Sequence, residues 1–203
     1  MRVEGQSAMP QDNCDPPRLP RAFYDRDPAT LARALLGQRL VRIADGQRVS
    51  GLISETEAYG GPDDQASHAF RRTPRSAIMY GPPGYAYVYF IYGMYFCLNA
   101  VAAADGQPGA VLIRGVVPQE GITIMRSRRP GVADAHLADG PGKVCQAFGI
   151  TRNLNAADLT ASSELWIEAG PGVPASRVVI TPRIGVRGDA AARNRLWRFL
   201  TRP

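Results

Sequence analysis

The sequence predicts an α+β fold: a single mixed domain in which helices surround a curved antiparallel sheet that carries a protruding hairpin. Three observations support this expectation. Several stretches alternate between apolar and polar residues and are joined by short glycine-containing turns, as in antiparallel hairpins. Between them lie segments with helical spacing and helix-capping residues. The 203 residues suffice for one full core, and the chain shows neither internal repeats nor a domain linker.

The first elements are a tail, a helix and a hairpin. Residues 1–20 lack an apolar core and are expected to form a flexible N-terminal tail, which leaves residues 21–203 as one folded domain. Residues 27–37 predict a helix, because Asp27 can cap it, Pro28 suits its first position and Gly37 suits its end. Residues 38–44 and 48–59 predict two strands paired across a tight turn.

The middle of the chain predicts a long loop followed by an aromatic hairpin. Residues 60–84 are polar and rich in Gly and Pro, and loops of this length are usually functional. Residues 85–92 and 94–103 predict strands joined at Tyr92-Gly93, and residues 85–99 hold seven of the 16 aromatic side chains. In a regular strand Tyr89 faces away from Phe90, so we expect Phe90 to enter the core. A slip of one residue would reverse these assignments.

The remaining sequence predicts alternating short elements. A buried strand carrying Arg114, a basic helix, and a helix that begins near Lys143 are expected at 110–118, 121–129 and 140–150. Two further strands are expected at 164–170 and 177–186, and residues 187–203 carry five arginines.

Charge favours a polyanionic partner. The net charge is +6 and the isoelectric point is near 9.6, which is typical of small nucleic-acid-binding proteins, although basic surfaces are common in general. Of the 24 Lys and Arg residues only Lys143 is a lysine, so one side-chain amine is available for Schiff-base chemistry.

Metal, secretory and membrane functions are not expected. The three cysteines and two histidines are isolated and show no metal-ligand spacing, and unpaired cysteines suit a reducing cytoplasm. No signal peptide is recognisable. Residues 76–104 carry no charge and are long enough to span a bilayer, but prolines and glycines interrupt them, so a membrane helix is not expected.

The segment Glu55-Thr-Glu-Ala-Tyr59 holds the residues best suited to catalysis. Glu55 and Glu57 share one face of a regular strand, where two carboxylates could carry out acid–base chemistry, although either could equally be a solvated strand residue. Tyr59 and His68 follow, and together with the aromatic hairpin they could enclose a flat ring. Proteins hold a flipped nucleobase with such stacking surfaces and a few polar atoms.

These motifs resemble, in order, those of the 3-methyladenine DNA glycosylases of the alkyladenine (methylpurine) type. The matching elements are TEAY (56–59), a His eleven residues after the Glu, TPR (73–75), YVYFIYGMYFCLN (87–99), LIR (112–114) and GPGKVCQA (140–147). The resemblance covers about residues 20–200, although residues 184–186 match only loosely.

The resemblance implies a role for each matching residue. Glu57 resembles the general base that activates water, and Arg114 resembles a residue that positions the reacting nucleotide. The residues that resemble the base pocket are Tyr59, His68, Tyr89 and Asn99, the last of which disfavours guanine. The residues that resemble the DNA-inserting hairpin tip are Tyr92 and its flank Met94. Thr73, Arg75 and Lys143 fall in segments that contact the DNA backbone.

The implied function is that of a monofunctional glycosylase that starts base excision repair. Enzymes of this kind flip alkylated or deaminated purines, such as 3-methyladenine, ethenoadenine and hypoxanthine, out of duplex DNA and hydrolyse the N-glycosidic bond. No metal or organic cofactor is implied. We expect a monomer that acts on double-stranded DNA containing damaged purines, in the bacterial cytoplasm and associated with the nucleoid.

Two other functions are compatible with these sequence features. A non-catalytic binder of damaged or single-stranded nucleic acid would use the same basic and aromatic surfaces, but it has no use for a carboxylate facing phosphates. A small glycoside hydrolase could use Glu55 and Glu57 as its carboxylate pair, but the positive charge and the exposed hairpin tip do not suit it.

Overall fold

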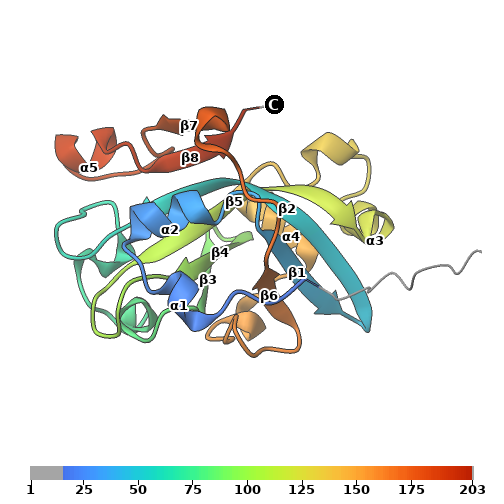
Figure 1. The fold of residues 1–203 in the computed structure, drawn as a ribbon, viewed down its shortest axis with the longest axis horizontal. Coiled ribbons are helices and arrows are strands. Elements are labelled where there is room, and N and C mark those ends of the chain that lie inside the picture. The colour runs from blue at the N-terminus through green and yellow to red at the C-terminus, as the bar shows by residue number, and fades with distance from the viewer. Residues whose placement is uncertain (1–15, 203) are drawn as a thin grey trace, which may run out of the picture.

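One eight-stranded sheet organises residues 16–202, which are the residues that the computed structural model describes (Figure 1). Every strand pairing is antiparallel and the sheet is not closed into a barrel, so the expected α+β class is confirmed. The central order is β3-β4-β5-β2-β1-β6, with β8 beside β2 and β7 beside β8. The strands are β1 (Arg39–Ala44), β2 (Gln47–Tyr59), β3 (Ala86–Ile91), β4 (Tyr95–Val101), β5 (Ala110–Glu120), β6 (Leu165–Glu168), β7 (Val178–Thr181) and β8 (Arg198–Thr201).

Strand β2 changes its neighbour halfway along its length. Residues 47–52 pair with β1, whereas residues 55–57 pair with β8, and β5 pairs with the opposite edge over residues 50–59. The register with β5 shifts on both sides of Glu55, and irregularities of this kind bend a strand. The second half of β2, which carries Glu55 and Glu57, thereby lies between β5 and the C-terminal strands.

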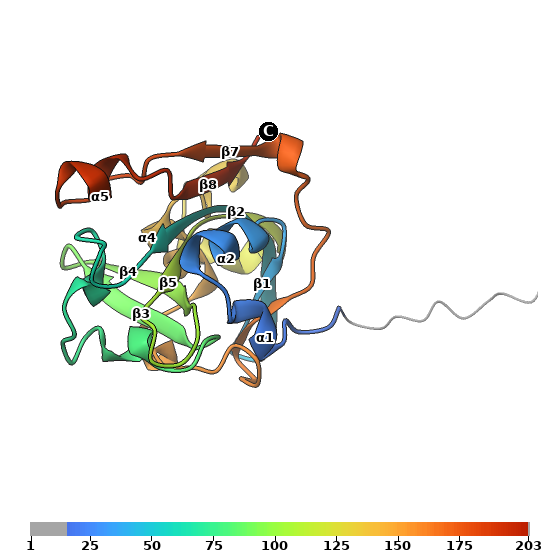
Figure 2. The ribbon, with the colours of Figure 1, turned by 60° about the vertical axis from the view of Figure 1, so that its left-hand side comes forward.

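Within residues 16–202 five α-helices accompany the sheet: α1 (Arg21–Tyr24), α2 (Pro28–Ala34), α3 (Ile122–Arg128), α4 (Pro141–Phe148) and α5 (Ala190–Asn194). Helix α2 begins as the sequence predicts, because the Asp27 carboxylate accepts the N–H groups of Ala29 and Thr30. Leu31 of α2 and Phe148 of α4 are buried in one hydrophobic core with the sheet residues Leu40 and Ile53. The two views in Figures 1 and 2 show α5, β7 and β8 along one edge of the molecule.

The β3–β4 hairpin turns at Tyr92-Gly93 as the sequence predicts, but Ile91 pairs with Tyr95, so three residues rather than two lie between the paired ends. Tyr89 is opposite Cys97, and the turn places Tyr92 and Gly93 at φ values of 55° and 69°. Positive φ at both central residues is what a type I′ hairpin turn requires. Tyr92 is 78% exposed and Met94 is 65% exposed, so the tip projects from the body.

The expectation that Phe90 enters the core is wrong. Ala86 and Val88 on the same face are buried, but Phe90 is 42% exposed and packs on the ring of Phe96, with centroids 5.0 Å apart. The alternation of faces is therefore predicted correctly. The end of β3 extends past the core, however, so Phe90 stays partly exposed although it lies on the core-facing side of the strand.

The two ends of the chain differ from the sequence-based expectations. The strand expected at 177–186 ends at Thr181, before Pro182, and the chain continues without regular structure to residue 188. Helices α1 and α5 and strand β8 were not predicted. Of the expected tail, residues 1–15 lie outside the described residues, whereas Leu19 is buried and donates its N–H to the carbonyl of Ile167 in β6.

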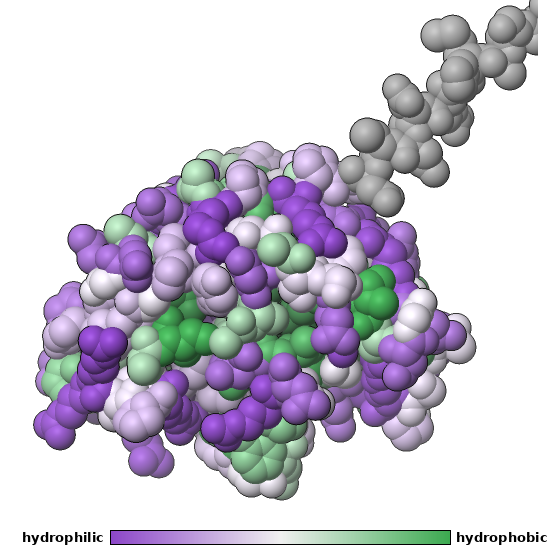
Figure 3. Space-filling view, turned by 90° about the horizontal axis from the view of Figure 1, so that it is seen from below, coloured by the Kyte–Doolittle hydropathy of each residue, from purple (hydrophilic) through white to green (hydrophobic). Residues whose placement is uncertain are grey.

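One face of the molecule combines apolar and hydrophilic regions. Figure 3 shows apolar residues gathered in a hollowed band on one face, with hydrophilic residues around them. No helix among residues 16–202 combines the length and the apolarity needed to cross a bilayer.

Candidate active site

A cavity of about 750 Å³ opens beside the hairpin and collects most of the residues predicted to form a site. Its walls come from the end of β2 and the following loop, the β3–β4 hairpin, β5, the start of α4 and residues 184–187. The predicted residues that line it are Tyr59, His68, Tyr89, Tyr92, Asn99, Arg114 and Lys143. Glu57, Thr73, Arg75 and Met94 are not among the lining residues.

Glu57 lies directly behind this lining and is fully buried. Its Oε2 accepts the Tyr59 hydroxyl at 2.8 Å and an Arg114 N–H at 3.2 Å. Its Oε1 accepts the backbone N–H of Ile184 at 2.7 Å. A carboxylate offers about four acceptor positions, so these three donors leave one position free. Two of the donors, Tyr59 and Arg114, themselves face the cavity.

Charges alternate along a chain of four side chains that ends at Glu57. Arg198 donates to Glu55 at 2.6 Å, Arg114 donates to the same Glu55 oxygen at 2.8 Å, and Arg114 also reaches Glu57. Both carboxylates thus point to one side of β2, as the alternation predicts. Burial by itself would lower the pKa of Arg114, but Glu57 and then Glu55 outweigh it and raise the pKa above its ordinary value.

Tyr59 connects the buried carboxylate to the cavity. Burial, followed by the charge of Glu57, raises the pKa of its hydroxyl well above the ordinary value. The hydroxyl therefore stays protonated and donates to Glu57. The Arg183 guanidinium packs against the tyrosine ring, 4.8 Å from its centroid.

Three aromatic rings form one wall of the cavity. His68 meets Tyr89 edge to face with centroids 4.7 Å apart, and Tyr87 lies 5.3 Å from Tyr89. The Nδ1 atom of His68 is hydrogen-bonded to the Tyr87 hydroxyl at 3.0 Å. Burial, followed by the charge of Arg75, lowers the pKa of His68 to about 4, so its imidazole is neutral at pH 7. The wall thus offers flat surfaces without a formal charge.

Asn99 is placed between the aromatic wall and β5. Its side chain is buried, lines the cavity and donates from Nδ2 to the carbonyl of Tyr87 at 3.0 Å. One N–H of the amide is therefore fixed by the backbone of the neighbouring strand. This bond holds the amide in a defined orientation at the cavity wall.

Of the other predicted residues, Lys143 lines the cavity, whereas Thr73 and Arg75 do not. Lys143, at the start of α4, forms an ion pair with Asp139 at 2.7 Å. Thr73 bonds the hydroxyl of Ser76 and closes a local turn. Arg75 packs over the ring of Tyr89 at 4.9 Å, and it thereby supports the aromatic wall from outside the lining.

Sequence reasoning gave no site role to several lining residues. Tyr87 was detectable, because it shares the strand face of Tyr89. Residues 184–186 match the family only loosely, and nothing in the local sequence indicates that Ile184 binds Glu57. Among residues 16–202 no group of three or more His, Cys, Asp or Glu side chains is arranged to hold a metal ion.

Comparison with known proteins gives a consistent answer. The family model described as "Methylpurine-DNA glycosylase (MPG)" matches residues 22–203. A protein from Methanocella arvoryzae named "Putative 3-methyladenine DNA glycosylase" is 52% identical, over 90% of this chain and 92% of its own length. Proteins of the same name from Clostridium acetobutylicum and Anaeromyxobacter dehalogenans are 44% and 49% identical, over 90% and 91% of this chain and 93% and 84% of their own lengths.

Proposed function

This chain belongs to the methylpurine-DNA glycosylase family and is a hydrolase of N-glycosidic bonds, and we propose that it flips damaged purines out of duplex DNA before it releases them. The proposed substrates are 3-methyladenine, 1,N6-ethenoadenine and hypoxanthine. The observation that carries this proposal is the fully buried Glu57 behind a cavity that has one uncharged aromatic wall. Such a site holds a flat base and places a carboxylate near its sugar.

The cavity suits a flipped purine in both size and chemistry. Its volume of about 750 Å³ is typical of small-molecule sites. A purine would stack between Tyr59 and Tyr89, and such stacking contributes about 1–3 kcal/mol per base. Asn99 faces the position where guanine would carry its 2-amino group, so an N–H donor there would disfavour normal guanine. Flipping also costs least where a damaged base pairs weakly.

In the proposed reaction Glu57 acts as the general base. A water molecule hydrogen-bonded to the remaining acceptor position of Glu57 attacks C1′ of the deoxyribose. Its proton passes to the carboxylate, and N9 of the purine takes the electron pair of the broken bond. A base that is already cationic leaves as a neutral molecule. Hypoxanthine and ethenoadenine are neutral and each requires a proton from solution as it leaves, so their release depends more strongly on pH.

Arg114 has two roles in this scheme. It holds Glu57 through a hydrogen bond at 3.2 Å and faces the cavity, where a cation attracts the phosphate beside the flipped nucleotide. Because Glu55 and Arg198 continue the alternation of charges, the guanidinium keeps its position without a net excess of charge around Glu57. The Glu57 carboxylate, in turn, stabilises the developing oxocarbenium ion.

The hairpin tip and the rim would bind the DNA. Tyr92, with Met94 at its flank, enters the space that the flipped nucleotide leaves, which offsets part of the unstacking free energy. Thr73, Arg75 and Lys143 contact the backbone. One cavity and one wedge suffice for a monomer that works on nucleoid DNA at the start of base excision repair.

The test is a strand-scission assay on duplex oligonucleotides that carry one ethenoadenine or one hypoxanthine. Abasic sites left by base release break in hot alkali. We expect breaks with the native protein, and a loss of rate of about 10²–10⁴-fold with Glu57→Gln, the range that general-base catalysis contributes. Glu164→Gln, at an exposed carboxylate far along the chain, is the matched control and should keep the native rate.

Two results would count against the proposal. Tight retention of the lesion duplex without alkali-sensitive breaks would favour a binding protein without glycosylase activity on these lesions. Equal rates for Glu57→Gln and the native protein would remove Glu57 from the reaction.

A further inference from the structure

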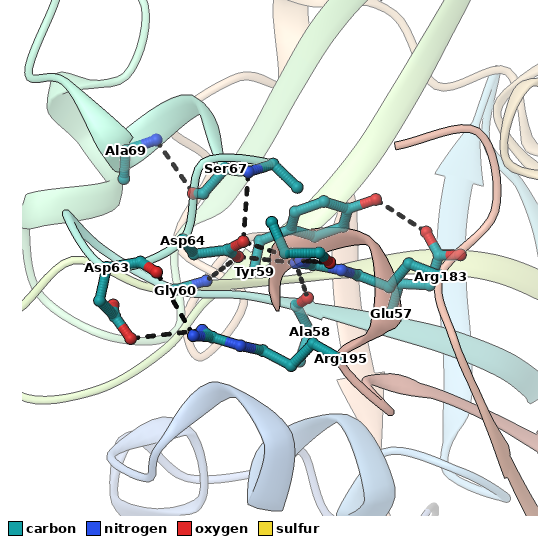
Figure 4. Close-up of polar contacts among 12 residues, drawn as sticks. Glu57, Ala58, Tyr59, Gly60, Asp63, Asp64, Ser67, Ala69, Arg183 and Arg195 are labelled. Carbon is teal, nitrogen blue, oxygen red and sulfur yellow. Dashed lines mark hydrogen bonds and ion pairs between the residues drawn. The ribbon is translucent and has the colours of Figure 1, made fainter. Parts of the chain in front are cut away.

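We propose that Arg183, paired with Asp64, is a positioning residue that holds Glu57, Tyr59 and the cavity wall at 184–187 in their working geometry. The inference rests on the proposed glycosylase function. It concerns an ion pair outside the cavity lining, formed by residues 119 positions apart in the sequence. Figure 4 shows Arg183 reaching across to the start of the loop that follows β2.

The guanidinium of Arg183 binds in several directions at once. It donates to both carboxylate oxygens of Asp64, at 2.6 and 2.7 Å, and both side chains are fully buried. The same two nitrogens also reach the carbonyls of Ala58 in β2 and Ala192 in α5, each at 2.9 Å. Arg183 thereby joins helix α5 to strand β2, which carries Glu57 and Tyr59.

Asp64 extends this tie into the loop that leads to the aromatic wall. Its carboxylate accepts the N–H groups of Gly60 at 3.0 Å and Ala66 at 3.2 Å. Its carbonyl accepts the N–H of Ser67, the residue before His68. The segment between Tyr59 and His68 is thus folded around the Asp64 carboxylate, which forms the ion pair with Arg183.

Two contacts carry the effect of Arg183 to the catalytic carboxylate. The next residue, Ile184, donates its backbone N–H to Glu57 at 2.7 Å, so fixing the side chain of Arg183 fixes this donor. The guanidinium also packs on the ring of Tyr59 at 4.8 Å, and the Tyr59 hydroxyl donates to the other oxygen of Glu57. Two of the three hydrogen bonds to Glu57 therefore depend on elements that Arg183 holds.

Stability alone does not account for a buried ion pair at this site. Apolar side chains of similar volume often replace a buried ion pair without loss of stability, and Arg183 leaves its Nε buried without a partner. Burial by itself would raise the pKa of Asp64, but hydrogen bonds from Arg183 and Gly60 outweigh it and lower the pKa. The pair thus stays charged and keeps the directional bonds that set the geometry.

The test compares Arg183→Lys with Arg195→Ala. Lysine keeps the charge but loses the planar fork that binds four acceptors. Arg195 packs on Trp197 at 4.4 Å and bonds Asp63, but it touches no residue of the cavity lining, so it is the matched control. Single-turnover rates on ethenoadenine duplex, and affinity for a duplex with a tetrahydrofuran abasic site, are measured under conditions where circular dichroism shows both variants folded.

We expect Arg183→Lys to lower the single-turnover rate by about 100-fold, the effect of a displacement of about 1 Å at a reacting group. Its affinity for the abasic duplex should change less than about threefold, because the hairpin tip and rim are untouched. Arg195→Ala should leave both quantities unchanged. An unchanged rate in a folded Arg183→Lys protein would overturn the proposal, and so would equal losses of rate and affinity.

A second measurement needs no activity. Hydrogen exchange at the backbone amide of Ile184 should be slow in the native protein, faster in Arg183→Lys and unchanged in Arg195→Ala. If the native protein released no base, the proposed function would fail, while this exchange pattern would still support the positioning role. Asp64→Asn should reproduce both effects of Arg183→Lys. If neither Arg183→Lys nor Asp64→Asn folds, the pair serves folding and the positioning proposal is overturned.

Discussion

The backbone N–H of Ile184 donates to Oε1 of Glu57 at 2.7 Å and thereby joins a strand to a loop 127 residues further along the chain. Tyr59 and Arg114 donate to the other oxygen, so both oxygens of the Glu57 carboxylate accept hydrogen bonds. Such a carboxylate cannot change its rotamer without breaking three hydrogen bonds. The position of Glu57 should therefore matter as much as its charge.

Shortening Glu57 tests this point. Glu57→Asp keeps the charge but withdraws the carboxylate from its donors, and we expect the single-turnover rate to fall about 100-fold. Glu55→Asp shortens the neighbouring carboxylate, which bonds Arg114 and Arg198 but does not bond Tyr59 or Ile184. That change should lower the rate by less than about tenfold, equivalent to about 1.4 kcal/mol. Similar losses in both variants would show that the position of Glu57 has no special effect.

The hairpin tip should show opposite effects on stability and on DNA binding. Tyr92 has a φ of 55°, a conformation that costs a non-glycine residue about 1–2 kcal/mol. Tyr92→Gly should therefore raise the free energy of unfolding by about 1 kcal/mol in urea denaturation. The same change removes the exposed ring, so retention on lesion duplex should weaken in a gel-shift assay.

Asp45 provides the control for the hairpin experiment. It has a φ of 53° in the β1–β2 turn and does not line the cavity. Asp45→Gly should raise stability slightly, because aspartate tolerates this conformation better than tyrosine does, and DNA retention should not change. If Tyr92→Gly bound lesion DNA as tightly as the native protein, the wedge role would be lost.

The sequence predicts the parts of this structure that depend on local pattern. The Asp27 cap, the strand alternation and the turn at Tyr92-Gly93 are each decided by residues within a few positions of one another. That alternation also places Tyr87 and Tyr89 together on the cavity side. The burial of Phe90 was misjudged because alternation gives the face of a side chain but not whether anything covers it.

The missed features depend on contacts between distant segments. Two contacts join the C-terminal region to β2 and to the loop that follows it. They are the ion pair between Arg183 and Asp64 and the hydrogen bond from Ile184 to Glu57. Pro182 could have indicated where β7 ends, but nothing in the local pattern shows that the next residues turn into the site. The sequence does not distinguish one buried arginine from the many exposed ones, so the burial of Arg183 becomes visible only in the folded structure.

The aromatic wall predicts an unusual titration for His68. Burial and then Arg75 lower its pKa from the ordinary 6.5 to about 4. The side chain of His68 is exposed at the cavity wall, and the surrounding water weakens both effects. The unfolded chain then binds more protons than the folded one between this pKa and 6.5. Stability should accordingly fall as pH decreases through that interval.

NMR titration of histidine-labelled protein measures this pKa directly, with His136→Gln used to assign the two signals. Arg75→Gln should raise the pKa of His68, because the nearby positive charge is removed. The same substitution should reduce the loss of stability on acidification. A pKa of 6.5 or above in the native protein would contradict the expected environment of the ring.

Lys143 decides whether the enzyme also cuts the DNA strand. Strand-cutting glycosylases form a Schiff base through an amine, and Lys143 is the single lysine of the chain and lines the cavity. Its amine forms an ion pair with Asp139 at 2.7 Å, which suits a phosphate contact better than a nucleophile. Borohydride should therefore trap no covalent adduct with lesion duplex, under conditions that trap a strand-cutting glycosylase.

Lys143→Ala should leave base release intact and reduce the salt dependence of DNA affinity by about one charge. An adduct that forms with the native protein and disappears in Lys143→Ala would assign the amine a covalent role instead.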